Sequence, residues 1–126
     1  MRTITISAGS VSLQAELNDS ATATAIWEAL PITARANTWG DEIYFGIPIK
    51  RGEEPGRREV MAVGELAYWP PGHAFCIFFG PTPASRGPEP RAASPVNPVG
   101  RVLGDASAFK AVRDGETITL ARAEPS

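Results

Sequence analysis

Prolines and glycines interrupt this chain too often for it to form long helices. The 126 residues include 12 Pro and 12 Gly, where average usage would give about six and nine. Proline lacks a backbone donor that a helix needs, and glycine loses much conformational entropy when it enters one. The sequence therefore argues against coiled coils and helical bundles and favours short elements separated by turns.

Size and charge narrow the class of protein further. A chain of 126 residues with a net charge of −2 fits one domain and has no strongly basic balance of the kind that favours nucleic acid. No apolar run approaches the roughly 20 residues that span a bilayer, and the N-terminal residues alternate too early for a signal peptide. We expect one domain over residues 1–126, with a core over about 3–121, in the cytoplasm. We expect no nucleic-acid or membrane partner.

Two scarce residue types limit the chemistry. His73 is the single histidine and Cys76 the single cysteine, so neither a disulfide within the chain nor a Cys-rich or two-His metal site can form. His73 is most simply a solvated turn residue, and Cys76 a small buried one on the opposite face of a strand. Gly100 and Gly104 lack the following helix of a dinucleotide motif. We expect no metal and no cofactor.

Alternating apolar and polar residues predict about eight short strands and one or two short helices. Residues 3–7 and 11–17 form a hairpin. A helix over 21–30 follows Asn18, Asp19 and Ser20, which offer capping oxygens, and stops at Pro31. The remaining expected elements are strands at 32–39, 42–47, 66–69, 74–79, 99–103 and 116–121, an extended segment at 60–64 and a short helix at 105–112. Residues 80–98, with six prolines, are expected to form one long loop. Short strands at this spacing favour a mostly β fold, a closed barrel or a sandwich.

Aromatic residues concentrate between residues 39 and 79, which hold eight of the ten. Phe75, Phe78 and Phe79 are expected in the core. Because neighbouring strand residues point to opposite faces, one of Phe78 and Phe79 fills the barrel, and the other lies under a helix or in a cleft. Four residues with polar ring atoms fit either a core or a shallow binding platform: Trp39, Tyr44, Tyr68 and Trp69.

An acidic pair lies among these aromatic residues. Asp41 is expected in a turn. Glu42 is either a surface strand residue or, next to aromatic side chains, an acid with a raised pKa. Both interpretations of Glu42 remain open from the sequence.

Several stretches taken together resemble a known family. They are, in order, residues 25–31 (AIWEALP), 39–45 (WGDEIYF), 63–72 (VGELAYWPPG), 78–83 (FFGPTP) and 95–102 (PVNPVGRV). They resemble the cyclophilin-like domain of unknown function found in small bacterial and archaeal proteins, over about residues 3–121. The resemblance implies a closed cyclophilin-like β-barrel, the fold of the peptidyl-prolyl isomerases.

The resemblance does not carry isomerase residues onto this chain. Cyclophilins surround their proline pocket with an Arg, a Gln, a His and several aromatic residues. Here the only glutamine is Gln14, in the N-terminal hairpin. Arg35 is a conceivable stand-in for the arginine, so whether the protein is an enzyme stays open.

Three functions follow from these observations. The first is a module that binds a small molecule or a peptide in a cleft. Its candidate residues are Trp39, Glu42, Tyr44, Tyr68, Trp69, Phe79, Thr82 and Asn97. The alternatives are a peptidyl-prolyl cis-trans isomerase and an interaction subunit of a larger bacterial enzyme, with a protein partner or a second copy of the chain.

Overall fold

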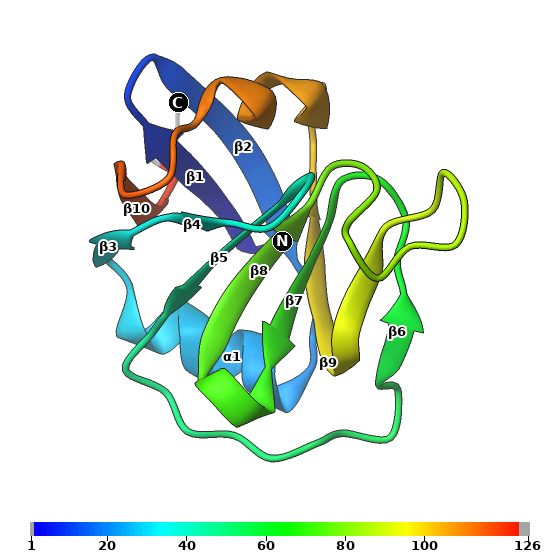
Figure 1. The fold of residues 1–126 in the computed structure, drawn as a ribbon. Helices are drawn as coiled ribbons and strands as arrows, with labels where there is room; N and C mark the ends of the chain where they lie inside the picture. The colour runs from blue at the N-terminus through cyan, green and yellow to red at the C-terminus, as the bar shows by residue number, and fades with distance from the viewer. Residues whose placement is uncertain (1, 124–126) are drawn as a thin grey trace.

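The protein is mostly β, as its sequence predicts. The computed structural model describes residues 2–123, which form ten strands, one α-helix and two 3-10 helices (Figure 1). The elements in chain order are β1 Arg2–Ala8, β2 Val11–Leu17, α1 Ala21–Ala29, β3 Ile32–Arg35, β4 Asn37–Thr38, β5 Glu42–Gly46, β6 Arg58–Val60, β7 Glu65–Trp69, η1 Pro70–Gly72, β8 Ala74–Phe78, β9 Arg91–Val102, η2 Ala106–Ala111 and β10 Thr117–Arg122.

The strands form one antiparallel, strongly curved sheet. Its hydrogen-bonded order is β3-β10-β1-β2-β9-β7-β8-β5-β4, and β6 pairs separately with β9. Among the described strands no ladder joins β3 to β4, so hydrogen bonds do not close the sheet and the expected closed barrel is not confirmed.

The two edge strands of this sheet meet at Ala36. Its backbone N–H donates to the Glu116 carbonyl over 2.8 Å, and its carbonyl accepts from the Gly115 N–H over 2.7 Å. Because these bonds go to the turn before β10, Ala36 joins no strand ladder. The single strand predicted over residues 32–39 is therefore wrong: it divides into β3 and β4.

Helices cover the two ends of the curved sheet, α1 at one and η2 at the other (Figure 1). Helix α1 begins where the Ser20 hydroxyl accepts from the Ala23 N–H over 3.1 Å, and it ends before Pro31. Both limits agree with the prediction. No helix within residues 2–123 is long and apolar enough to cross a membrane.

Apolar side chains gather in two cores on opposite faces of β7, β8 and β9. The main core lies inside the curved sheet and includes Phe45, Phe75, Phe79 and Phe109. A smaller outer core consists of Met61, Ala67, Cys76, Phe78, Ala92 and Val96. Phe78 and Phe79 thus fall in different cores, as their neighbouring positions predict.

Strand β9 corrects the prediction of a loop over residues 80–98. Regular strand begins at Arg91, which leaves residues 80–90 as the loop. Pro98 is tolerated because the pairing of β7 with β9 shifts register between Leu66 and Ala67, where Gly100 and Pro98 are the partners. In addition, β9 pairs with β6, then β7, then β2 along its length. Pro95 likewise lies between Arg91 and Val96, where the pairing of β6 with β9 shifts register, so both prolines of β9 lie at irregularities of the ladder.

Candidate functional site

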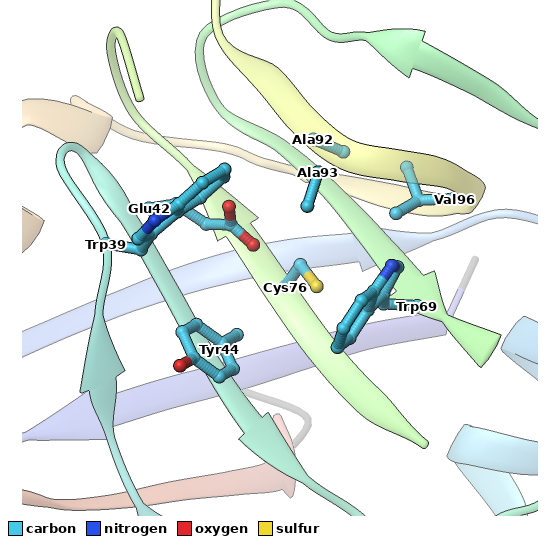
Figure 2. A pocket seen from close by; sticks show the side chains of 8 residues that line it. All are labelled: Trp39, Glu42, Tyr44, Trp69, Cys76, Ala92, Ala93 and Val96. Carbon is cyan, nitrogen blue, oxygen red and sulfur yellow. The ribbon is translucent and has the colours of Figure 1, made fainter. Parts of the chain in front are cut away.

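A pocket of about 270 Å³ opens on the outer face of β5, β8, β7 and β9, above the outer core (Figure 2). Its lining brings together four of the predicted site residues, Trp39, Glu42, Tyr44 and Trp69. The other lining residues are Cys76, Ala92, Ala93 and Val96.

The pocket exists because small residues lie in the middle and large ones at the sides. Cys76 on β8 pairs with Ala67 on β7 and with Tyr44 on β5. Cys76 and Ala67 fill little space above the sheet, whereas Tyr44 and the two tryptophans rise around them. Figure 2 shows Trp39 and Tyr44 on one side and Trp69 and Val96 on the other.

A tight turn positions the Trp39 side of the pocket. The Trp39 N–H donates to the Glu42 carbonyl over 2.9 Å, and the Glu42 N–H donates back over 3.2 Å. Gly40 adopts a φ of 59° in this turn, and a Cβ there would lie 2.9 Å from Thr82 Cα. Only glycine fits this combination of left-handed backbone and close approach. Asp41 lies in this turn, as predicted.

On the opposite side of the pocket, a hydrogen bond orients the Trp69 ring. The Trp69 indole Nε1 donates to the Ser94 hydroxyl oxygen over 2.7 Å, which links the end of β7 to β9. The ring is half-buried, with its remaining surface available to the pocket.

Glu42 is the carboxyl group of the pocket. Its side chain is 5% exposed, and its carboxylate points into the space between the two aromatic sides (Figure 2). Within residues 2–123, no Arg, Lys or His lies within ion-pair distance of it. Glu42 is therefore not the surface strand residue that one interpretation predicted.

Burial also changes the acid–base behaviour of this group. Burial raises the pKa of Glu42 to about 7, while the neighbouring Cys76 thiol acts in the opposite direction. Burial, with the charge of Glu42 beside it, raises the pKa of Cys76 well above its usual value. The pocket thus contains one carboxyl that changes protonation near neutral pH and one thiol that stays protonated.

Two further predicted site residues, Tyr68 and Asn97, lie on the other face and hold a loop. We call residues 47–57 the strap; it runs from β5 toward β6 along the lower margin of Figure 1. The Tyr68 hydroxyl donates to the Ile49 carbonyl over 2.7 Å and accepts from the Arg51 N–H over 3.1 Å. Asn97 Oδ1 accepts from the Glu54 N–H, and Asn97 Nδ2 donates to the Gly52 carbonyl, both over 2.9 Å.

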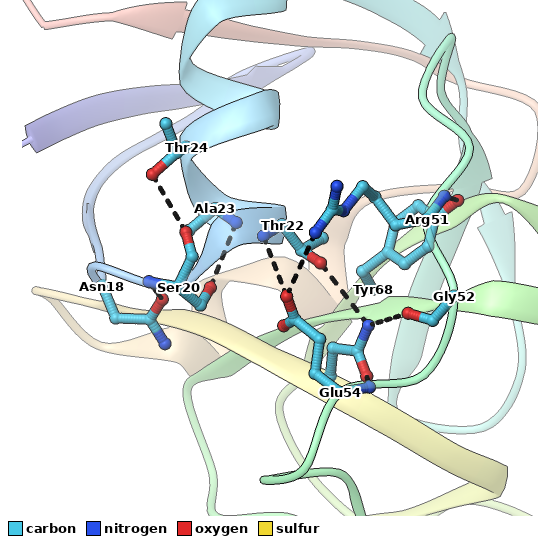
Figure 3. Close-up of polar contacts among 10 residues, drawn as sticks. Asn18, Ser20, Thr22, Ala23, Thr24, Arg51, Gly52, Glu54 and Tyr68 are labelled. Carbon is cyan, nitrogen blue, oxygen red and sulfur yellow. Dashed lines mark hydrogen bonds and ion pairs between the residues drawn. The ribbon is translucent and has the colours of Figure 1, made fainter.

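The strap in turn contacts the start of α1. The Glu54 carboxylate accepts from the Thr22 N–H over 3.2 Å and lies 3.6 Å from the Arg51 guanidinium (Figure 3). A carboxylate at a helix N-terminus is stabilised by the unpaired N–H groups there. Tyr68 and Asn97 therefore tether the strap, and neither lines the pocket.

Phe79 and Thr82 also lie outside the pocket lining. Phe79 packs in the main core, with its ring centre 6.1 Å from that of Phe109. Thr82 is buried in the 80–90 loop, where its hydroxyl donates to the Arg91 carbonyl and accepts from the Ala84 N–H. Since the Asp41 N–H donates to the Pro81 carbonyl over 2.9 Å, this loop supports the turn that carries Trp39.

His73 is an exposed turn residue, as expected, with a φ of 47°. Its Nδ1 lies 3.2 Å from the Tyr68 hydroxyl, on the side of the strap. Among residues 2–123 no three His, Cys, Asp or Glu side chains cluster as metal ligands would.

The sequence interpretation missed four lining residues. For Cys76 the sequence predicts only a buried residue on the face opposite Phe75 and Ile77, and the structure shows that this face is the outer one. Ala92, Ala93 and Val96 fall within the predicted 80–98 loop, so the sequence does not indicate that they line a pocket. The sequence carries no alternation here, because Ala92 and Ala93 are the same residue type; they differ only in the structure, where Ala92 is buried and Ala93 is exposed.

A mostly β chain with this curved sheet matches the cyclophilin-like family model over residues 2–121, and the chain belongs to that family. The solution structure of a hypothetical protein of Archaeoglobus fulgidus is similar, with 38% sequence identity and a TM-score of 0.81. The match covers 97% of this chain and 95% of that one. A comparison with curated proteins found no match.

Proposed function

We propose that the protein binds a small molecule or a peptide side chain in the pocket above the outer core. The observation that carries this proposal is the buried Glu42 carboxyl, which faces an aromatic cavity without a charged partner in the described chain. Ligand sites are typically apolar cavities with a few polar groups that fix orientation. Burial of such a carboxyl costs folding free energy, so a purely structural role does not explain it.

The pocket favours binding over proline isomerisation. An isomerase of this fold would need an arginine beside the bound proline, and no arginine is among the lining residues described above. Arg35, the conceivable stand-in, lies on β3, where its guanidinium donates to the Gly115 carbonyl over 3.4 Å. A protease-coupled assay with proline peptides tests the alternative, and a rate above background that depends on Glu42 would favour it.

A pocket-blocking variant tests the binding proposal. Ala93 lines the pocket but is exposed, so Ala93→Phe fills the opening without disturbing a core. Ala108→Phe, on the exposed surface of η2, is the matched control. In an NMR fragment screen, we expect ligands that shift the Trp39 and Trp69 indole signals in the wild type and the control only. Equal binding to the Ala93→Phe variant would contradict the site assignment.

A further inference from the structure

We propose that the pocket binds an organic ammonium group, with the Glu42 carboxylate as its counter-ion and the rings of Trp39, Tyr44 and Trp69 around it. This proposal rests on the proposed binding function and adds the chemical class of the ligand.

The aromatic residues provide the first argument. Trp39, Tyr44 and Trp69 come from three separate segments, and each ring is half-buried with surface left at the pocket. They lie on two sides of one cavity (Figure 2). Faces of tryptophan and tyrosine rings attract cations, and several rings around one site are a recurrent way to bind alkylated ammonium groups.

Charge provides the second argument. Every other lining residue is uncharged, so the pocket has one ionisable carboxylate and no positive group. A buried carboxylate is poorly solvated and gains most from a positive partner. A cationic ligand supplies that partner, whereas an anionic ligand would be repelled by Glu42.

Size provides the third argument. A volume of about 270 Å³ lies just below the range of pockets that hold drug-sized molecules. The occupant is therefore an ammonium group with few carbons, either a free small molecule or the end of a modified lysine side chain.

Binding should be linked to the protonation of Glu42. A quaternary ammonium ion does not titrate, and it favours the ionised carboxyl. The pKa of Glu42 is raised to about 7, so affinity should rise as pH increases through 7 and level off above it. The titratable groups that face Glu42 in the pocket are Cys76 on β8 and Tyr44 on β5.

The test compares choline with its neutral isostere 3,3-dimethylbutan-1-ol, by NMR titration at pH 8. We expect choline to bind the wild type more tightly than the isostere. Glu42→Gln should weaken choline binding about tenfold, because it removes the charge and keeps the shape of the side chain. The affinity for the neutral isostere should change by less than about twofold. Glu28→Gln, which changes an exposed glutamate of α1, is the control for net charge and should bind choline like the wild type.

Two further arms separate the parts of the proposal. Trp39→Leu keeps an apolar side chain but removes the aromatic face, so it should weaken the binding of choline more than the binding of the isostere. A peptide with one trimethyllysine distinguishes the two sources of the ammonium group: tighter binding than free choline indicates a peptide, and weaker binding a small molecule.

Equal affinity for choline and the isostere, unchanged by Glu42→Gln, would overturn the ammonium proposal and leave the binding proposal intact. If neither compound binds but other fragments do, and Ala93→Phe abolishes their binding, the ammonium proposal alone is wrong. If no compound reaches the pocket in any arm, both proposals fail.

Discussion

Two glutamates, one in the strap on the inner side of the sheet and one in the pocket on its outer side, have very different surroundings. Glu54 in the strap contacts the Thr22 N–H and the Arg51 guanidinium. Glu42 in the pocket is more deeply buried, and the described chain offers it no cation. The fold therefore gives the Glu54 carboxylate a charged partner, whereas the Glu42 carboxylate has the Cys76 thiol beside it and, among the described residues, no cation.

Adjacent residues in one strand face either the strap or the pocket. Tyr68 faces the strap while Trp69 faces the pocket, and Asn97 and Val96 divide in the same way. A mutation on one face can thus be compared with one at the adjacent position on the other. Substitutions on the strap face should lower the free energy of unfolding without changing ligand affinity, whereas substitutions on the pocket face should change ligand affinity.

The largest expected effect concerns the pH dependence of stability at Glu42. Because its folded-state pKa of about 7 exceeds the usual value of 4.5, the protonated carboxyl favours the folded state. This contribution is fully present below pH 4.5 and is lost as pH rises through 7, by about 3 kcal/mol in all. Glu42→Gln should abolish that loss, and urea unfolding at pH 5 and pH 8.5 measures it. A wild type and variant with parallel pH profiles would contradict the assignment.

Asn97→Ala should destabilise the protein by about 2 kcal/mol. The change leaves the Gly52 carbonyl and the Glu54 N–H without their partners, which is costly for buried polar groups. Chemical denaturation measures the effect, and binding at the pocket should be unchanged under native conditions. A loss of ligand affinity without a loss of stability would mean that Asn97 belongs to the binding site after all.

Tyr68→Phe should cost about 1 kcal/mol, because it removes only the hydroxyl between Ile49 and Arg51. Hydrogen exchange of the Arg51 amide should rise at the same time, since its acceptor is lost. Unchanged exchange at Arg51 would show that the hydroxyl does not hold the strap.

The smallest expected effect is that of Glu54→Gln, a loss of about 0.5 kcal/mol at pH 8, because the charge at the start of α1 is partly exposed. The change in the free energy of unfolding should have the opposite sign for Glu42→Gln, which should be more stable than the wild type at the same pH. Thermal unfolding of both variants in one buffer checks the contrast. The same sign for both would remove the distinction between the two carboxylates.

Much of the fold can be predicted from local sequence. The β1–β2 hairpin, the Ser20 cap and the stop at Pro31 each depend on a few neighbouring residues, and the structure confirms them. The break at Ala36 and the start of β9 at Arg91 depend on partners far along the chain. Local alternation and proline content cannot reveal those partners.

The candidate site shows a similar limit. Alternation places Tyr68 and Trp69 on opposite faces but does not say which face is the interior. In β8 every residue from Ala74 to Phe78 is buried, so no polar position marks the outer face. The aromatic concentration and Glu42 could be found from sequence, whereas the exclusion of Tyr68 and Asn97 from the pocket required the strand register.

The two aromatic sides of the pocket differ in the strands that carry them. Trp69 ends a strand that is paired on both flanks, whereas Trp39 follows β4, a two-residue strand at the edge of the sheet. We expect an occupant larger than the empty cavity to displace Trp39 and leave Trp69 in place. The Trp39 side of the pocket would then move while the Trp69 side stays in place, so the pocket could accept related molecules of somewhat different size.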